Sequence, residues 1–457
     1  MMHLSVVLRC EAADPVTPAN AGMSITAPPG DSDSLDFGVV TIGGKAPVVS
    51  SMSITPGTVP ATFDDPTDPT KHPPLPSDIL PSRPAKFLAM KGLDTRLSGC
   101  LYYKTIGAVK DCDFEGNFRG GAVSFEDWKR TVKIDQYALP GTPQYRAVFV
   151  NKVDLNLTRD HHSVSYKSVS NPLGVTAGYV CNHTGPQLDP TSLSPTQLDI
   201  DKAIDNAVAG RNLVACVAMD YSVTPGVNNN MPFTRFLIFG PSGDLLPSVN
   251  LDGRGEKFVP GTCTVCHGGN KYAGKFPEDG TGTGDLEAHF LPFDTGNFEF
   301  HTPGWPALTK EAQQEAIYQL NQNVLKTNAN LAEMDLISGW YKNGHIQNEL
   351  FVPPEIENDS IRGPFYLNVI ARSCRTCHIA QRDQNSIRDL NFSKKGAGAL
   401  GSSILAELVC GQTDDLLRSY AMPNSAVTFD LFWKSTQPSL IASMLVPKAT
   451  CTNPKAP

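Results

Sequence analysis

The chain has 457 residues, of which 38 are basic and 46 acidic, so its formal net charge is −8 at pH 7. It contains no long basic run, which argues against nucleic acid as a partner, and no apolar run near the roughly 18 residues of a transmembrane helix. With 38 glycines, 37 prolines and only 18% charged residues, the composition is typical of a loop-rich protein of several domains rather than of a helical bundle.

Residues 1–97 are rich in proline, serine, threonine and aspartate, particularly around 65–69 and 72–76. Such a segment has too few apolar side chains for a core, so we predict an extended leader or linker with a short strand at 38–42. The first residues lack the basic start and the apolar run of a secretory signal. We therefore expect the signal peptide to be truncated or to lie upstream of this start.

Short apolar, β-branched runs separated by turn residues fill the segment 98–250. This spacing predicts a β-rich domain, to which the residues assign no role. One short helix is expected to begin after Ser124, whose hydroxyl can cap it. The clearest runs are 147–155, 175–180, 213–221 and 233–239.

Two Cys-x-x-Cys-His motifs occur in the second half of the chain. Their members are Cys263, Cys266, His267, Cys374, Cys377 and His378. This spacing is the attachment signature of c-type haem: the two thiols form thioethers with the haem vinyl groups, and the histidine is the proximal ligand of the iron. The sequence therefore predicts two haem c groups. Zinc is the rival for these thiols, but zinc ribbons place their cysteine pairs only about 15–20 residues apart.

The first motif lies in a predicted haem domain at 251–354, with helices expected after the cap residue Thr309 and at about 331–341. No single residue stands out as the sixth ligand of its iron. His289 is the nearest histidine downstream and has apolar neighbours, as a haem crevice would. A five-coordinate iron would instead be open to O₂ or peroxide. The other candidates are His161, His162, His301, His345 and Met334, although Met334 also fits a helix core.

The second motif lies in a predicted haem domain at 355–457. We expect a helix at 364–373 leading into the motif and a C-terminal helix at 428–445, interrupted by Pro438. Met422, which precedes Pro423, is the expected distal ligand of this iron. A thioether sulfur prefers ferrous iron and therefore raises the reduction potential. The alternative is that Met422 only fills core space.

Seven cysteines remain outside the motifs, and basic residues lie beside both of them. Pairing the cysteines in order predicts three disulfides and leaves Cys10 over, although six cysteines allow 15 arrangements. The basic side chains could bind haem propionates, dock an acidic redox partner, or form a solvated face. The expected disulfides are Cys100–Cys112, Cys181–Cys216 and Cys410–Cys451, and the basic residues are Arg254, Lys257, Lys271, Lys275, Arg372, Arg375 and Arg382.

Residues 251–450 resemble di-haem c-type cytochromes of bacteria in the two motifs, in the loop 259–269 and in the Met422-Pro423 pair. The resemblance implies a class I cytochrome c fold for 355–451, in which Tyr366 would pack on Phe432 or Trp433. The fold class expected for the whole chain is multidomain α+β. A β-rich N-terminal domain would be followed by two mainly α-helical, cytochrome c-like haem domains.

The expected function is extracytoplasmic electron transfer through two covalent haems to an unidentified redox partner protein, in the periplasm or as a secreted protein. The alternative is a di-haem peroxidase or haem oxygenase with an open first haem. A third possibility is that the β-rich domain recognises a partner or a carbohydrate. The sequence identifies no catalytic residue and leaves the oligomeric state open.

Overall fold

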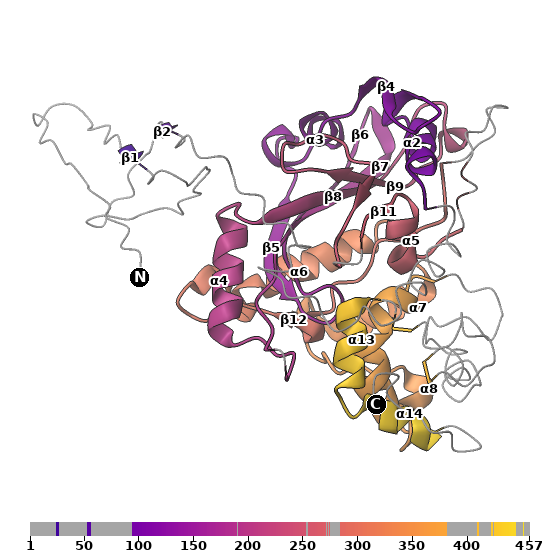
Figure 1. The fold of residues 1–457 in the computed structure, drawn as a ribbon. Coiled ribbons are helices and arrows are strands. Elements are labelled where there is room, and N and C mark those ends of the chain that lie inside the picture. The colour runs from indigo at the N-terminus through magenta and orange to yellow at the C-terminus, as the bar shows by residue number, and fades with distance from the viewer. Residues whose placement is uncertain are drawn as a thin grey trace, which may run out of the picture.

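A computed structural model describes residues 94–381 except 190, 253–254, 271, 273 and 275–283, together with 409–410, 422–423, 425–444 and 451 (Figure 1). It also places two short strands near the N-terminus, β1 (Ser24–Thr26) and β2 (Ser53–Thr55), which pair in parallel. The predicted leader up to residue 93, including the strand at 38–42, otherwise lies outside the described residues, whereas its last residues, Arg96 and Leu97, begin helix α2 (Arg96–Thr105). Also outside the described residues are Cys10, Arg254, Lys271, Lys275 and Arg382.

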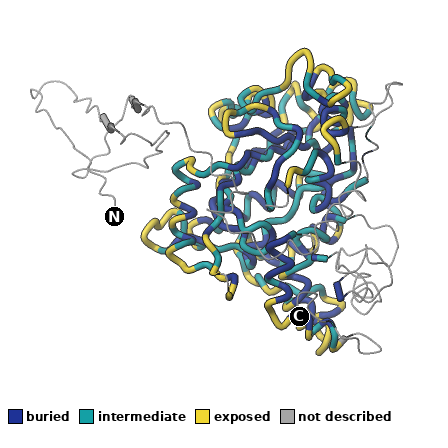
Figure 2. The backbone as a smooth tube through the Cα atoms, viewed as in Figure 1, coloured by how far each residue is buried: buried dark blue, intermediate teal, exposed yellow. Residues whose placement is uncertain are grey.

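A six-stranded antiparallel sheet forms the centre of the molecule, in the strand order β12-β5-β6-β7-β8-β9. Its strands are mostly buried, whereas exposed residues lie mainly in peripheral helices and loops (Figure 2). The sequence predicted parts of four of these strands but not β6, where a run of charged and histidine residues breaks the apolar pattern. The strands are β5 (Gln144–Asn151), β6 (Leu157–Ser168), β7 (Asn171–His183), β8 (Leu213–Ser222), β9 (Phe233–Phe239) and β12 (Phe298–Glu299).

Helix α3 (Phe125–Val132) covers one face of the sheet, and helix α2 (Arg96–Thr105) covers its edge strand β9. The Ser124 hydroxyl accepts the Asp127 N–H, which confirms the predicted cap of α3. The hydroxyls of Tyr102 and Tyr103 on α2 accept backbone N–H groups of β9 at 3.0 and 3.1 Å. An edge strand has unpaired N–H groups, so these tyrosines satisfy donors that would otherwise be open to another chain.

Helices also cover the β5 side of the sheet, one on each face. Helix α4 (Gln197–Val208) packs on Val148 and Val150. Helix α6 (Lys310–Val324) packs through Ile317 and Leu320 on the alternate residues of β5. Both faces of the antiparallel sheet are therefore covered by helices at its β5 side. The structure confirms Thr309 as the cap of α6. It also confirms the helix predicted at about 331–341, which is α7 (Leu331–Trp340).

The fold class predicted from the sequence is wrong, because the chain does not pass from a β-rich domain into two independent helical haem domains. Residues 251–354 supply strand β12 and helix α6 to the central sheet. Cys263 of the first motif belongs to the same hydrophobic core as Phe236 of β9. The architecture is a mixed α+β fold on one large antiparallel sheet. Helical periodicity in 251–354 indicated helices correctly, but it could not show that their apolar faces pack on a distant sheet.

The C-terminal helices form a smaller cluster beside the sheet. The predicted helix leading into the second motif begins at Arg362, and the predicted C-terminal helix is divided in two near Pro438. Tyr366, Phe432 and Trp433 lie in one hydrophobic cluster, as expected. These elements are α8 (Pro354–Glu357), α9 (Arg362–Phe365), a π-helical turn (Tyr366–Ile370), α10 (Ala371–Ser373), α11 (Arg375–His378), α13 (Ala426–Trp433) and α14 (Gln437–Met444).

Hydrogen bonds at the start of α13 attach this cluster to the turn between β5 and β6. Thr428 donates its hydroxyl to the carbonyl oxygens of Val153 and Asp154, and Ser425 also donates to Asp154. The remaining elements are two-stranded sheets. They are β3 (Val109–Cys112) with β4 (Phe118–Ala122), β10 (Ser248–Val249) with β11 (Lys257–Phe258), and β13 (Tyr341–Lys342) with β14 (His345–Ile346).

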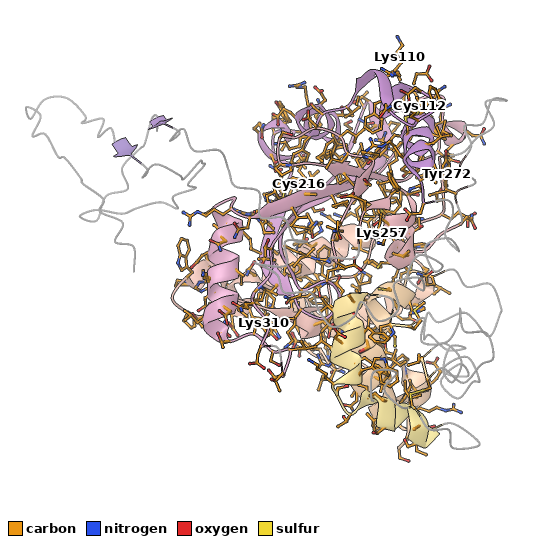
Figure 3. All side chains as sticks on the ribbon, in the orientation of Figure 1. Lys110, Cys112, Cys216, Lys257, Tyr272 and Lys310 are labelled. Carbon is orange, nitrogen blue, oxygen red and sulfur yellow. A yellow bond between two sulfur atoms is a disulfide. The ribbon has the colours of Figure 1, made fainter. Side chains whose placement is uncertain are left out.

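All three predicted disulfides are present. Cys100–Cys112 joins α2 to β3, Cys181–Cys216 joins β7 to β8, and Cys410–Cys451 joins two segments near the C-terminus. Figure 3 shows Cys216 within the six-stranded sheet and Cys112 outside it, on β3. Disulfides persist in oxidising compartments, so they indicate an extracytoplasmic or secreted protein. Within the described ranges, no helix combines the length and apolar character needed to cross a bilayer.

A charged cluster lies on the sheet face that α3 covers. Arg146 holds Asp160 through two bonds of 2.8 Å. The ring of His162 lies between two carboxylates, with Nε2 at 3.1 Å from Asp160 and Nδ1 at 3.3 Å from Asp135. Both nitrogens can donate only when the ring is protonated. Although burial opposes the charge, the two carboxylates raise the pKa of His162 above 6.5, and the pKa values of Asp135 and Asp160 are lowered.

Because the pKa of His162 is raised, we expect the stability of the folded protein to fall as the pH rises above neutrality. A raised histidine pKa contributes stability below 6.5 that is lost as the pH rises through the folded-state value. The lowered pKa values of Asp135 and Asp160 act in the opposite sense, because the stability that they contribute is lost only when the pH falls into the acid range. We expect His162→Gln to have a lower Tm than the wild type at pH 6 and a smaller deficit at pH 9. One kcal/mol corresponds to about 2–4 °C in a domain of 150–250 residues and to less in a longer chain. A deficit that does not change with pH would contradict the assignment.

Candidate functional site

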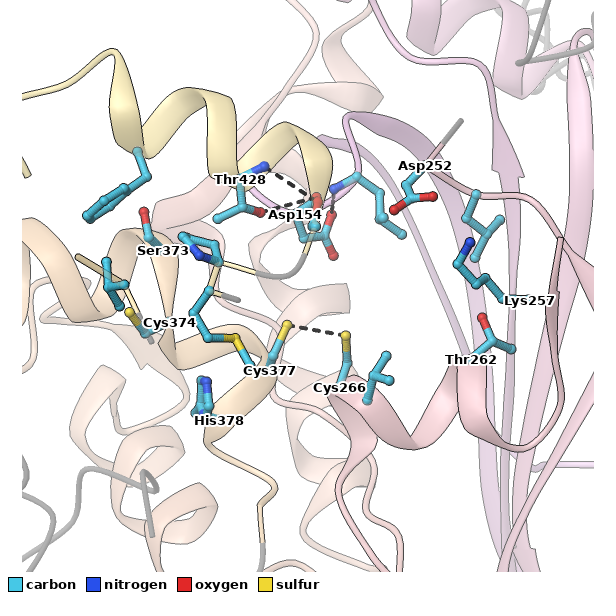
Figure 4. Close-up of a pocket in the computed structure, with 18 of the residues that line it drawn as sticks. Asp154, Asp252, Lys257, Thr262, Cys266, Ser373, Cys374, Cys377, His378 and Thr428 are labelled. Carbon is cyan, nitrogen blue, oxygen red and sulfur yellow. Dashed lines mark hydrogen bonds between the residues drawn. The ribbon is translucent and has the colours of Figure 1, made fainter. Parts of the chain in front are cut away.

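The two Cys-x-x-Cys-His motifs, far apart in sequence, lie side by side. Helix α5 (Gly261–His267), which carries the first motif, packs against α11, which carries most of the second. Figure 4 shows the sulfur atoms of Cys266 and Cys377 facing each other, 3.2 Å apart. The side-chain amide of Gln381 donates to the Val265 carbonyl at 3.2 Å and to the Cys377 carbonyl at 2.8 Å. One side chain therefore ties the two motifs together.

Gly268, directly after the first motif, permits this close approach. Its φ of 70° and ψ of −155° belong to a region that only glycine adopts readily. A Cβ atom at this position would lie 1.9 Å from the carbonyl oxygen of Ala380, which follows the second motif. The backbones behind the two motifs thus touch at a point where no side chain fits.

A cavity of about 120 Å³ opens where the motifs meet. Its wall contains Cys266 of the first motif together with Cys374, Cys377 and His378 of the second. Met422 lines the same cavity. Asp154 borders it from the turn between β5 and β6, Lys257 from β11 and Thr428 from α13 (Figure 4). The structure thus brings together four of the six motif residues and the methionine predicted as a distal ligand.

The second motif presents a donor set that fits a c-type haem. Two thiols, one imidazole and one thioether share the cavity wall, as covalent attachment with histidine and methionine ligation requires. The enclosed volume is below the roughly 300–1,000 Å³ of pockets for cofactor-sized ligands. The cavity is therefore smaller than a haem needs. Helix α13 borders it through Thr428 and Phe432.

The first motif is more deeply buried. Cys263 is only 7% exposed and packs in the core of the sheet, and the ring of His267 lies 5.4 Å from that of Phe236. Its Nδ1 contacts the carbonyl oxygen of His289 at 2.8 Å, which leaves Nε2 as the nitrogen for a metal. Burial lowers the pKa of His267 to about 4, so the ring is neutral, as a ligand must be.

His289, one of the candidates for the sixth ligand, lies beside His267. Its backbone N–H donates to the His267 carbonyl at 2.9 Å, and its own carbonyl contacts the His267 ring. Its Nδ1 lies 3.2 Å from Oε2 of Glu333, which is fully buried. A carboxylate on one ring nitrogen is a common support for a metal-binding histidine. The His289 carbonyl therefore supports the ring of His267, whereas the role of the His289 ring as a ligand stays a prediction.

The other proposed ligands of the first iron lie in less favourable surroundings. Both ring nitrogens of His162 are held by carboxylates, so this geometry does not favour its predicted role as a ligand, which remains untested. His161 is half-buried with its ring edge-on to that of Phe293, and desolvation lowers its pKa to about 3. Met334 is 39% exposed on α7, and His345 is exposed.

Three of the motif thiols have raised pKa values. Burial raises the pKa of Cys263 and that of Cys374, the latter to about 12. A hydrogen bond with Cys266 and burial raise the pKa of Cys377 well above 9. Catalytic cysteines have lowered pKa values that favour the thiolate, so these three residues do not fit a thiol enzyme.

No protein-family model, no curated protein and no solved structure matches the chain. In addition, no group of three or more His, Cys, Asp or Glu side chains within the described segments could hold a metal ion. The predicted membership of the bacterial di-haem c-type cytochrome family is therefore wrong. The chemistry of the two motifs is a separate question, because a haem takes only two thiols and one or two axial ligands from the protein.

Several residues of the site were not predicted from the sequence. Glu333 had appeared only as part of a helix, and Gln381 had no assigned role. Asp154 lies in the segment assigned to the β-rich domain, and Thr428 was expected only as the start of the C-terminal helix. The glycine pair after the first motif was one available signal, because adjacent glycines often mark a close backbone approach. Among the basic residues, Lys257 borders the cavity, whereas Arg375 is only 3% exposed and is therefore unavailable for docking a partner.

Proposed function

We propose that this protein transfers electrons outside the cytoplasm through haem c bound covalently at its two Cys-x-x-Cys-His motifs. The observation that supports this most strongly is the distribution of the cysteines. Among the described cysteines, six form disulfides, and the four free ones are the four motif thiols. In an oxidising compartment unused thiols tend to be oxidised. Thioether attachment explains why these four are kept apart from the disulfides.

The cavity supports the same proposal. His378 and Met422 share its wall with both thiols of the second motif, so they can supply the two axial ligands. His267 supplies the proximal nitrogen of the first site, and the His289 carbonyl orients it. The haem iron, when bound, cycles between its ferric and ferrous states. The chain holds the ligands, excludes water and determines the potential through burial and ligand type. The electrons would pass to a redox partner protein.

The test is to produce the full chain in a bacterium with a c-type haem attachment system. We expect two covalent haems per chain by pyridine haemochrome and mass spectrometry. Replacing Cys263 and Cys266 together with alanine, or Cys374 and Cys377 together, should leave one. Met422→Ala should abolish the sulfur-to-iron charge-transfer band and lower one reduction potential, because a soft ligand for ferrous iron is lost. Thr262→Ala, at the same cavity, is the matched control.

Absence of covalent haem from the wild-type chain made in that host would refute the proposal. An unchanged spectrum in Met422→Ala would remove this residue from the site. A high-spin haem that binds carbon monoxide and reacts with peroxide would favour the alternative of a peroxidase or oxygenase with an open first haem.

A further inference from the structure

The two cysteines of each motif face different surroundings. The first cysteine of each motif packs into its own hydrophobic cluster, Cys263 into the core of the sheet and Cys374 against the C-terminal cluster. The second cysteines, Cys266 and Cys377, meet at the junction, with their sulfur atoms 3.2 Å apart. A disulfide bond is about 2.05 Å long, so these two sulfurs need to move by only about 1.2 Å to bond.

The surrounding contacts hold this pair in place. The side-chain amide of Gln381 donates to the carbonyl oxygen of Val265, which precedes Cys266, and to the carbonyl oxygen of Cys377 itself. Gly268 lies against Ala380 just beyond the two motifs. The cavity borders both sulfur-bearing residues, so a small thiol reagent has a route to them once its walls open.

We infer that Cys266 and Cys377 form a reversible disulfide between the two motifs in the chain that carries no haem. The oxidant is a small-molecule or protein disulfide. One of the two cysteines, as the thiolate, attacks it to form a mixed disulfide and expels one thiolate. The second cysteine then displaces the other half. Two S–H bonds are lost and one S–S bond forms between the motifs. The oxidant takes up the two electrons and leaves as two thiols that carry the two protons.

Formation of this bridge does not depend on the proposed electron transfer, but its consequence for haem attachment rests on that proposal. The bridge occupies one thiol of each motif, so neither motif offers both thiols for attachment until the bridge is reduced. It also protects the pair from oxidation to sulfinic or sulfonic acid, which is irreversible. Reduction of the Cys266–Cys377 disulfide would therefore free the thiols of both motifs for haem attachment in one step.

The experiment uses the full chain with Cys10→Ser, made in a host without haem attachment and equilibrated with oxidised glutathione. Free thiols are trapped with N-ethylmaleimide, and the digested protein is analysed by mass spectrometry. We expect a peptide pair that links Cys266 to Cys377, with Cys263 and Cys374 alkylated. Titrated thiols should fall from four to two on oxidation and return to four with dithiothreitol. Cys263→Ser should keep the bridge, and Cys266→Ser should lose it.

A link within either motif, or four alkylated thiols after oxidation, would overturn the inference. Its failure can be told apart from failure of the proposed function. If the bridge is absent but the matured protein carries haem, only the bridge is refuted. If the bridge forms and reduced protein still accepts no haem in the attachment-competent host, the bridge stands and the electron-transfer proposal is lost.

Discussion

Replacing Gly268 with alanine is expected to destabilise the protein by roughly 3–5 kcal/mol, the sum of backbone strain and overpacking. The backbone conformation at this residue is accessible essentially to glycine alone, and the added Cβ would lie 1.9 Å from the Ala380 carbonyl oxygen. Neither backbone can move alone, because α5 packs in the core of the sheet and α11 is joined to it through Gln381. The motifs must separate to relieve the contact.

Urea-induced unfolding of the full chain measures this effect, and Gly210→Ala is the matched control. Gly210 also has a positive φ, of 68°, but a Cβ there would meet no atom within 4 Å. The control should therefore cost only about 1–2 kcal/mol, from the left-handed backbone alone. The excess in Gly268→Ala reports the contact between the motifs. Equal losses in the two variants would show that this contact contributes little to stability.

Arg375→Met is expected to cost roughly 3–5 kcal/mol, the range measured when one partner of a buried ion pair is removed. Arg375 occupies a variable position of the second motif. Its Nη2 lies 2.5 Å from Oδ2 of Asp294, and its Nη1 donates to the Tyr366 hydroxyl at 3.2 Å. The guanidinium also lies over the rings of Trp340 and Tyr366, at 5.6 and 5.5 Å from their centres. Removing it leaves the Asp294 carboxylate buried without its counter-charge.

A double-mutant cycle with Asp294→Asn separates the ion pair from packing. The double variant should recover part of the stability that Arg375→Met loses, because no uncompensated carboxylate then remains. Arg372→Met is the control: Arg372 is exposed and donates to the Gly296 carbonyl at 2.7 Å, so it should cost only about 1 kcal/mol. If Arg375→Met costs no more than this control, the pair does not stabilise the second motif.

Local structure could be predicted from the sequence where it depends on neighbouring residues. Ser124 and Thr309 cap their helices as expected, because a cap needs only a hydroxyl and the N–H groups of the next turn. The strands with regular apolar spacing were also found. β6 was missed because Asp160 and His162 are polar yet face the sheet's interior, where Arg146 and Asp135 compensate them. That compensation comes from other elements and is invisible in a local pattern.

The sequence by itself determined the chemistry-bearing residues: two motifs, one methionine beside a proline, and three disulfides whose order of pairing proved correct. Motif spacing is a local property, so it can be recognised without the fold. Only the tertiary structure decided that the motifs share one junction and that residues 251–354 belong to the sheet. Those facts depend on which apolar faces pack together and on a glycine at 268 that lets two backbones touch, and neither follows from spacing along the chain.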